Sequence, residues 1–461
     1  MVVGHRLLKL NRLNKASGLA AILRASQMMT GKRMQTTNST TMLILTLAIL
    51  MLPGFSLAEE ISSSNPIGAN VQELLHWADE HNPELAAMRY ETDAASERIA
   101  PAGALPDPLL RVELQDFAGR DAPDGFNPLP GKGNGTKYTL MQSFPLWGKR
   151  DLRREVATAQ LEQFKGHRLV SVAETHARIK NAYALYFQTV GLKKLNEKIL
   201  TLLGDLESVT RVRYASGLVP QQDAIRAQVE KTTLQSEIIS LEAEQEQAKA
   251  RLNAILGRAQ DAPLSELPAL RHLPPEKLDS AGLQQKAIRN SPQLATQSAE
   301  ISVADANKRL IEKNRYPDLT LGIAPTQRGS NISSWEAMVE VNIPIRLDTR
   351  RSQENEATAM LIAARERRSG VENQVIGELQ ENIVAFEAAE KQGQLITYTL
   401  LPQAELTFRS ALAGYENGKV DFATLLDAQK AIRLARQGQL KMRVEQEIRL
   451  AEIEKMIGED L

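Results

Sequence analysis

Tyr214-Ala-Ser-Gly-Leu-Val219 returns later in the chain, with its tyrosine, glycine and valine unchanged, as Tyr415-Glu-Asn-Gly-Lys-Val420. Each copy leads into an Ala-Gln pair, Ala227-Gln228 in the first case and Ala428-Gln429 in the second. A period of about 201 residues is typical of a duplicated structural unit rather than of a short solenoid repeat. We therefore expect one body made of two similar halves.

Further landmarks occur in the same order in both halves. They are Asn82-Pro83 and Ser291-Pro292, Pro106-Asp107 and Pro317-Asp318, Phe144-Pro145 and Ile343-Pro344, and finally Gly257 and Gly458. The landmarks divide the chain into a first repeat at 59–257, a linker at 258–282 and a second repeat at 283–461.

Each repeat has the same predicted order of elements: a helix, a pair of strands and two long helices. Proline ends helices, alternation of apolar and polar residues indicates strands, and long proline-free stretches indicate helices. The first repeat is predicted to have helices at 70–101, 149–213 and 221–256, and strands at 109–117 and 136–144 around a Gly- and Pro-rich loop at 118–135. The second is predicted to have helices at 282–315, 350–414 and 421–457, and strands at 319–324 and 335–343 around a polar loop at 325–334. Pro402 should kink or divide its helix.

Two of the long helices carry the apolar spacing of a coiled-coil seam, in which positions three and four apart alternate. The first seam is Val172, His176, Ile179, Tyr183, Tyr186 and Val190, and the second is Ile376, Leu379, Ile383 and Phe386. His176 is therefore interpreted as a packed residue rather than as a metal ligand.

Residues 1–58 read as an export signal. Basic residues precede an 11-residue apolar run at 42–52, which is too short to span a bilayer, and Ala58 ends a small-residue cleavage site. An uncleaved membrane anchor is the alternative interpretation. After Ala58 no apolar run reaches 18 residues, so no membrane-spanning helix is expected.

Composition excludes several classes of protein. The first 58 residues hold seven Lys/Arg and no Asp/Glu, which leaves 49 basic and 56 acidic residues, a net charge of −7, and this argues against a nucleic-acid binder. The chain has no cysteine, which excludes disulfides, thiolate metal sites and cysteine nucleophiles. No catalytic motif and no metal-ligand cluster is visible, so we expect neither an enzyme nor a bound cofactor.

The four predicted strands are nearly as long as the 9–11 residues that cross a bilayer, and each has one apolar and one polar face. Aromatic residues lie near both ends of the strands, as in an interfacial girdle; they are Trp335, Phe117 and Tyr138 at one end and Trp147, Phe144 and Tyr316 at the other. Four strands cannot close a barrel, whereas three chains would supply twelve. A soluble sheet packed on helices is the alternative interpretation.

The duplication, the two Tyr-x-x-Gly segments and the segment Gln142-Ser-Phe-Pro-Leu-Trp-Gly-Lys-Arg-Asp-Leu-Arg153 together resemble a TolC-type outer membrane efflux factor. The resemblance covers about residues 65–458, and Ala104-Leu-Pro-Asp-Pro108 is most similar to the branch that serves heavy-metal (cobalt/zinc/cadmium or copper/silver) RND pumps. Many members of that branch carry a lipidated cysteine after the signal, which this chain lacks.

The resemblance implies an α+β membrane protein of a Gram-negative outer membrane. It implies a homotrimer whose twelve-stranded transmembrane β-barrel sits in lipid and continues as a periplasmic tunnel of coiled-coil helices. It further implies docking to a periplasmic adaptor and an inner-membrane RND pump, and a passive exit duct for metal cations. Drug efflux, type I protein secretion and a periplasmic coiled-coil scaffold remain alternatives.

The resemblance also predicts a gate beside the second Tyr-x-x-Gly segment. Tyr415 matches a family tyrosine that narrows the entrance, and Asp427 matches one of the family's gate aspartates. Thr424 and Val420 stand where the family pattern can have a second aspartate and a basic residue, so the ion-pair network is expected to differ. Asp223 is a second carboxylate candidate. Three copies of Asp427 around a threefold axis would form a cation-selecting ring.

The two Tyr-x-x-Gly segments are also predicted to be contact points for the adaptor. The glycine of each suits a tight turn between helices. The predicted contact residues are Gly217, Leu218 and Val219 in the first repeat and Gly418, Lys419 and Val420 in the second.

Overall fold

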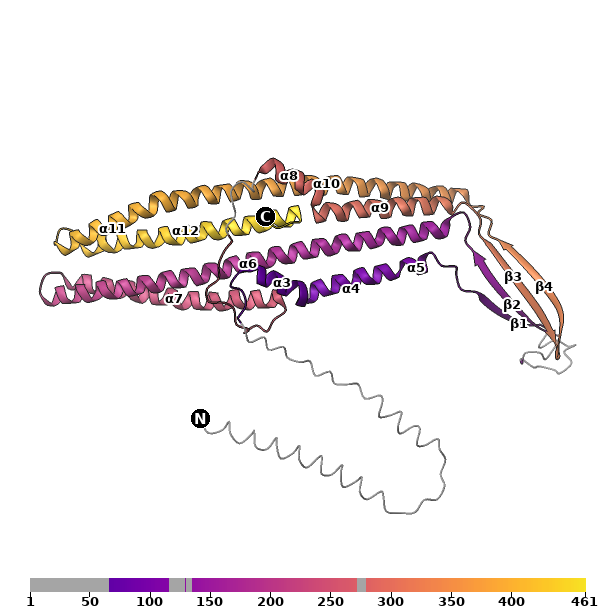
Figure 1. Cartoon of the computed structure of the whole chain (residues 1–461), viewed down its shortest axis with the longest axis horizontal. Coiled ribbons are helices and arrows are strands. Elements are labelled where there is room, and N and C mark those ends of the chain that lie inside the picture. The colour runs from indigo at the N-terminus through magenta and orange to yellow at the C-terminus, as the bar shows by residue number, and fades with distance from the viewer. Residues whose placement is uncertain (1–65, 116–128, 130–134, 272–278) are drawn as a thin grey trace, which may run out of the picture. The chain divides into compact units, whose positions relative to one another are not determined.

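The computed structural model describes residues 66–115, 129, 135–271 and 279–461, and residues 64–461 form one unit. In this unit a sheet lies at one end of the long helices, and the two turns that contain the Tyr-x-x-Gly segments lie at the other (Figure 1). The predicted signal at 1–58, Phe117 and most of the predicted loop at 118–135 lie outside the described residues.

The first helix of each repeat is broken, and the predictions of single helices at 70–101 and 282–315 were wrong. The first becomes α3 (Val71–His81), α4 (Pro83–Glu97) and α5 (Ile99–Ala102), and the second becomes α8 (Ser280–Asn290) and α9 (Pro292–Lys313). The breaks at Asn82 and Ser291 each come directly before a proline, which disfavours the helical conformation in the residue that precedes it. Asn82 is extended, and its side chain accepts hydrogen bonds from the N–H groups of Glu84 and Leu85, so it starts the next helix.

The predicted long helices are confirmed. They are α6 (Lys149–Ala215), α7 (Gln221–Leu256), α10 (Leu347–Leu395), α11 (Leu401–Glu416) and α12 (Phe422–Ile457). At 1.5 Å per residue, α6 alone is about 100 Å long. A π-helical turn, η2 (Ile396–Leu400), separates α10 from α11 next to Pro402, and the N–H of Leu401 donates to the carbonyl of Ile396. Pro402 has no N–H for the regular ladder, which explains the predicted division.

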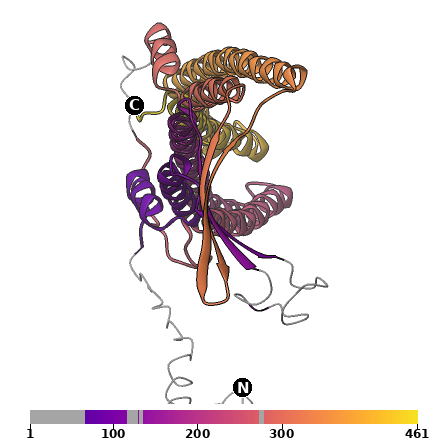
Figure 2. The same cartoon turned by 90° about the vertical axis from the view of Figure 1, so that its right-hand side faces the viewer.

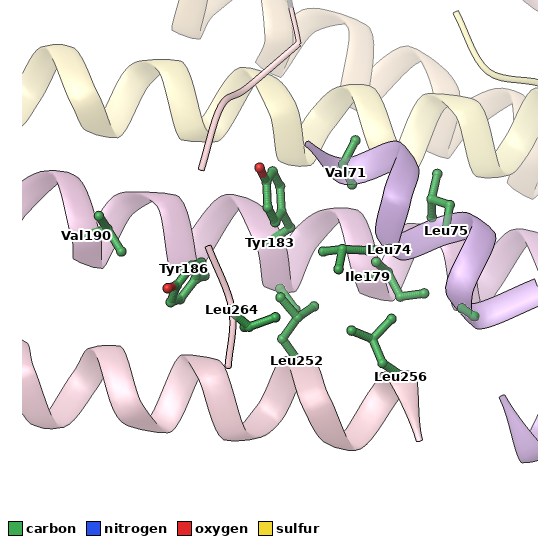
Figure 3. Close-up of a cluster of buried hydrophobic side chains, with 12 residues drawn as sticks. Val71, Leu74, Leu75, Ile179, Tyr183, Tyr186, Val190, Leu252, Leu256 and Leu264 are labelled. Carbon is green, nitrogen blue, oxygen red and sulfur yellow. The ribbon is translucent and has the colours of Figure 1, made fainter. Parts of the chain in front are cut away.

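The first predicted seam is buried from Ile179 onward, in a cluster where α3, α6 and α7 meet (Figure 3). Tyr183 is 2 % exposed, and its hydroxyl lies 3.0–3.2 Å from the carbonyls of Gly68, Ala69 and Ala269, so it fastens two connecting segments to α6. His176 is half-buried and lies 2.8 Å from Asp79 through Nε2 and Oδ1. In the second seam Val375 takes the buried place predicted for Ile376.

Buried ion pairs join the two repeats near the middle of α6 and the end of α12. Lys180 of α6 lies with its Nζ 2.7 Å from Oε2 of Glu454 on α12, and both side chains are almost fully buried. Arg271 of the linker reaches Oε1 of the same glutamate with its Nη1 at 2.8 Å, and Lys180 also pairs with Asp460. The first repeat, the linker and the second repeat therefore share one buried carboxylate.

The sheet has four antiparallel strands in the order of the chain, and Figure 2 shows its two hairpins side by side. The strands are β1 (Leu109–Gln115), β2 (Gly135–Phe144), β3 (Leu319–Arg328) and β4 (Asn331–Val341). The predicted loop at 325–334 was wrong, because both strands continue through it to a tight turn at Gly329. Pro325 interrupts only the ladder to β2, where it has no N–H to donate, and a bulge follows it at Thr326.

Cross-strand pairing puts most of the exposed apolar side chains of the four strands on one face. Leu110, Leu140 and Ile323 lie in one row, and all three are exposed. The other exposed apolar residues of this face are Val112, Leu321, Trp335, Val339 and Val341. The opposite face carries Arg111, Glu113, Lys137, Glu336 and Glu340. None of the helices in the described part of the chain is long and apolar enough to cross a membrane.

Helix packing follows the duplication. Next to the sheet, α6 lies between α4 and α9, and α9 also contacts α10. Toward the turns, α6 packs against both α7 and α12. Because α6 belongs to the first repeat and α12 to the second, this last contact brings the two turns together.

Candidate functional site

The two turns that contain the Tyr-x-x-Gly segments, called here the tips, have the same backbone structure. In the first tip the N–H of Leu218 donates to the carbonyl of Arg213 at 2.9 Å, and in the second the N–H of Lys419 donates to Gly414 at 2.8 Å. Gly217 and Gly418 have φ of 71° and 67°, and a Cβ on either would meet nothing within 4 Å. The glycines are therefore required by the left-handed backbone and not by lack of space.

The second tip is anchored to the first repeat through Tyr415. The ring is 3 % exposed and packs against Phe422, with ring centroids 5.4 Å apart. Its hydroxyl donates to Oγ1 of Thr210 on α6 over 3.4 Å. The Thr210 hydroxyl in turn donates to the carbonyl of Leu206 at 2.7 Å, which leaves its oxygen to accept from Tyr415.

Arg213 adds two further contacts between the tips. Its guanidinium carbon lies 5.0 Å from the centroid of the Tyr415 ring, a cation–π distance. Its Nη1 donates to the carbonyl of Glu416 at 3.0 Å. We call the contacts of Thr210 and Arg213 with Tyr415 and Glu416 the tip latch. Sequence reasoning missed Thr210 and Arg213, because no pattern along the chain relates them to residues about 200 positions away.

Two aspartates of the tips, Asp223 and Asp421, have pKa values shifted in opposite directions. Asp223 is buried, and burial raises its pKa, which nearby Arg226 opposes and Asp421 reinforces. Asp421 caps α12, and its Oδ1 accepts from the side chain and backbone of Thr424 at 2.6 and 2.9 Å. These hydrogen bonds to Thr424 hold the pKa of Asp421 below its usual value.

Asp427 is exposed on α12 and has no hydrogen bond or ion pair within the described ranges. A shift of 201 residues, which relates the two tips, places Asp427 at the position of Arg226 and Thr424 at the position of Asp223. The two repeats therefore present opposite charges at one equivalent position.

The predicted contact residues divide into an exposed and a packed group. Leu218 is 67 % exposed, and Gly217, Gly418 and Lys419 are exposed as well. Val219 and Val420 are half-buried, and Val219 packs against the cluster that contains Tyr415 and Phe422. Each tip thus shows solvent a glycine and one long side chain.

Two repeats of paired long helices, a four-stranded sheet at one end and two packed tips at the other are the fold that this chain shares with solved outer-membrane channels. Residues 74–258 and 283–459 match the family described as outer membrane efflux protein, and the chain belongs to that family. Its members are channels rather than enzymes.

Relatives of known function and structure agree with this family. The cobalt-zinc-cadmium resistance protein CzcC of Cupriavidus metallidurans is 26 % identical over 372 residues, which cover 77 % of this chain and 82 % of CzcC. The outer membrane protein VceC of Vibrio cholerae is 16 % identical with a TM-score of 0.70, over 85 % of this chain and 96 % of that one. CusC is 16 % identical with a TM-score of 0.71, over 86 % and 94 %.

Proposed function

We propose that the chain is the outer-membrane exit duct of a tripartite efflux system, in which three copies close a twelve-stranded barrel that continues as a helical tunnel. The sheet carries this proposal, because each of the four strands puts an exposed apolar side chain on the same face, and β1 and β4 leave their outer edges unpaired in the described part of the chain. Lipid does not tolerate open strand edges, so other copies have to close the sheet. A cyclic trimer does so without leaving an edge.

The aromatic residues at the two ends of the sheet support its position in lipid. Trp147 is 52 % exposed and stacks on Tyr316 with centroids 5.1 Å apart, near the helix end of the strands. Trp335, 67 % exposed, lies on the apolar face toward the other end. Exposed tryptophan and tyrosine at two levels are typical of the borders of a membrane.

The tips are proposed to close the tunnel at rest. Tyr415 is proposed to stabilise the closed tips by packing against α6, and not to line the pore. Its ring is buried against α6, so its contribution is to keep α11 and α12 beside the first repeat. Asp427 is exposed and free of partners in the described part, so three copies are proposed to form the carboxylate ring that narrows the entrance and favours cations. Asp223 is buried, which favours a structural role within the tip.

A periplasmic adaptor and an inner-membrane RND pump are the proposed partners. The exposed residues of the tips, Leu218 and Lys419 above all, are the proposed contacts with the adaptor. An adaptor that straightens a tip would have to break the latch, which couples docking to opening.

Metal cations are the proposed cargo. The support is the likeness to CzcC, whose name describes cobalt, zinc and cadmium resistance. In the described residues no three His, Asp or Glu side chains are grouped to hold a metal ion, so a transported metal would be cargo rather than a resident cofactor.

Expression in an efflux-deficient Gram-negative host tests this function. We expect a heat-resistant trimer in the outer-membrane fraction, and restored tolerance to cobalt, zinc or cadmium when the matching adaptor and pump are present. Restored tolerance to drugs alone would indicate that the cargo is organic molecules and not metal cations. Recovery of the chain as a soluble periplasmic protein would contradict the channel and favour a coiled-coil scaffold.

A further inference from the structure

The two hairpins of the sheet have the same strand register once the repeat is taken into account. Pro106-Asp107 and Pro317-Asp318, just before β1 and β3, are 211 residues apart. Phe144-Pro145 at the end of β2 and Ile343-Pro344 just after β4 are 199 residues apart. Shifting the observed pair Leu110–Leu140 by these two intervals gives Leu321–Val339, which is the pair observed in the second hairpin. The pair Val112–Tyr138 likewise becomes Ile323–Ala337, also observed.

Within the chain, β2 of the first hairpin pairs with β3 of the second. The equivalent contact under the repeat is β4 with β1, and one chain cannot form it because these strands are at opposite edges of its sheet. Applying the same intervals to β2 and β3 yields a pairing of β4 with β1, and these two strands are the opposite edges of the sheet. We infer that β4 of one copy pairs with β1 of a second copy in the register that the repeat dictates, with Val339 opposite Val112 and Glu340 opposite Arg111. This inference rests on the proposed trimer and specifies its interface.

The apolar face supports this register. Leu140 pairs with Ile323 inside the chain, and the same intervals place Val339 opposite Val112 of the second copy. The neighbouring rows become Val341 opposite Leu110 and Ala337 opposite Leu114. The exposed apolar face of one copy thus continues into the next without a break. A slip of one residue would turn a whole strand over and put charged side chains on that face.

The polar face decides between this register and slips of two residues, which preserve the faces. Arg111 and Glu340 form no ion pair in the described part of the chain, whereas Lys137 lies 2.6 Å from Glu336. The inferred register puts Arg111 opposite Glu340 and Glu113 opposite Met338. A slip of two residues in one direction puts Glu113 opposite Glu336, and in the other direction opposite Glu340. Like charges directly opposite each other destabilise a sheet, so both slips are disfavoured.

Disulfide trapping tests the register, because the chain has no cysteine of its own. The full chain carrying Val112→Cys with Val339→Cys, or Arg111→Cys with Glu340→Cys, should form disulfide-linked trimers in outer membranes under mild oxidation. Directly opposite residues have Cα atoms about 4.5–5.5 Å apart, within the range of a disulfide. The control pairs, Val112→Cys with Ala337→Cys or with Val341→Cys, lie two residues out of register at about 8 Å and should not cross-link.

The outcomes separate the register from the trimer. Cross-linking of a control pair in place of the inferred pairs would overturn the register and keep the trimer. Heat-resistant trimers in which neither inferred pair reacts would do the same. A monomeric protein in which no pair reacts would overturn the proposed trimer as well.

Charge reversal gives a second measurement that needs no oxidation. Arg111→Glu and Glu340→Arg should each lower the temperature at which the trimer dissociates in detergent, and the double variant should recover most of that loss. Additive losses in the double variant would contradict the inferred contact.

Discussion

The hydroxyl of Tyr415 lies 3.4 Å from Oγ1 of Thr210, and this hydrogen bond crosses from the second repeat to the first inside the buried base of the tips. The equivalent tyrosine of the first repeat, Tyr214, is 43 % exposed. In the first repeat this tyrosine faces solvent, whereas in the second repeat it holds the α11–α12 tip against α6. This difference makes the second tip the one that is held.

Tyr415→Phe should weaken the latch without disturbing its packing. The substitution keeps the ring against Phe422 and under Arg213 but removes the hydroxyl, so we expect a loss of about 0.5–1.5 kcal/mol in local stability. Hydrogen exchange of the α11–α12 tip amides would measure it. Tyr214→Phe is the matched control and should leave exchange unchanged; equal effects from both would show that the contact with Thr210 is not what holds the tip.

Arg213→Ala should loosen the tip more than Arg211→Ala. Arg213 loses both the cation–π contact with Tyr415 and the hydrogen bond to the carbonyl of Glu416, whereas Arg211 is an exposed arginine on the same turn of helix. The expected cost is about 1–2 kcal/mol, because each contact contributes about 0.5–1 kcal/mol. Limited proteolysis at the tip reports the difference. Protection equal to that of the wild type would remove Arg213 from the latch.

Gly418→Ala should destabilise the tip by about 1–2 kcal/mol, because a Cβ is unfavourable at φ of 67° even where space is available. Gly204→Ala makes a good comparison, since Gly204 lies inside α6 with no neighbour within 4 Å of a Cβ and no positive φ. Alanine should stabilise the helix there by about 0.5–1 kcal/mol. Thermal unfolding of the two variants should therefore shift in opposite directions, and a shift in the same direction would contradict the backbone argument.

The tips should respond to pH through Asp223 and Asp421 with opposite signs. Burial raises the pKa of Asp223, so the folded tip favours the protonated form, and its stability falls as pH rises from the usual value of 3.8 through the raised pKa. Asp223→Asn should thus make the tip more stable at pH 7. Hydrogen bonds from Thr424 lower the pKa of Asp421, whose stabilisation is present above pH 3.8 and is lost as pH falls through the lowered pKa.

Hydrogen exchange at pH 4 and pH 7 distinguishes the two aspartates. Asp421→Asn should loosen the tip at pH 7, where Asp223→Asn tightens it. A loosening by both variants at pH 7 would mean that Asp223 is stabilised as a carboxylate by Arg226 and that burial is not its main influence.

The long helices and the tips could be predicted from the sequence because their signals are local. Proline-free stretches and the repeated glycine mark where helices run and turn. The loop at 325–334 was predicted from the polar residues of that stretch. Pro325 begins the stretch, and a proline inside a strand is normally unfavourable. It is tolerated in β3 because it breaks only the ladder toward β2, and β3 keeps its pairing with β4 on the other side.

The latch could not be predicted, for a different reason. Thr210 and Arg213 acquire their roles only when the two tips pack side by side, and neither residue stands out in its own helix. Asp427, in contrast, could be selected from the sequence by its position relative to Gly418. A pore-lining carboxylate needs to be exposed and unpaired, and Asp427 is both within the described residues.

Planar-bilayer conductance of the purified trimer, with wild type compared to Asp427→Ala, tests most directly whether the chain is a passive duct narrowed by a carboxylate ring. The account predicts stable single-channel steps that prefer cations in the wild type, and larger or longer-lived steps with a weaker cation preference in the variant. Steps that the substitution leaves unchanged would remove Asp427 from the gate. No steps at all from a folded protein in lipid would contradict the channel itself.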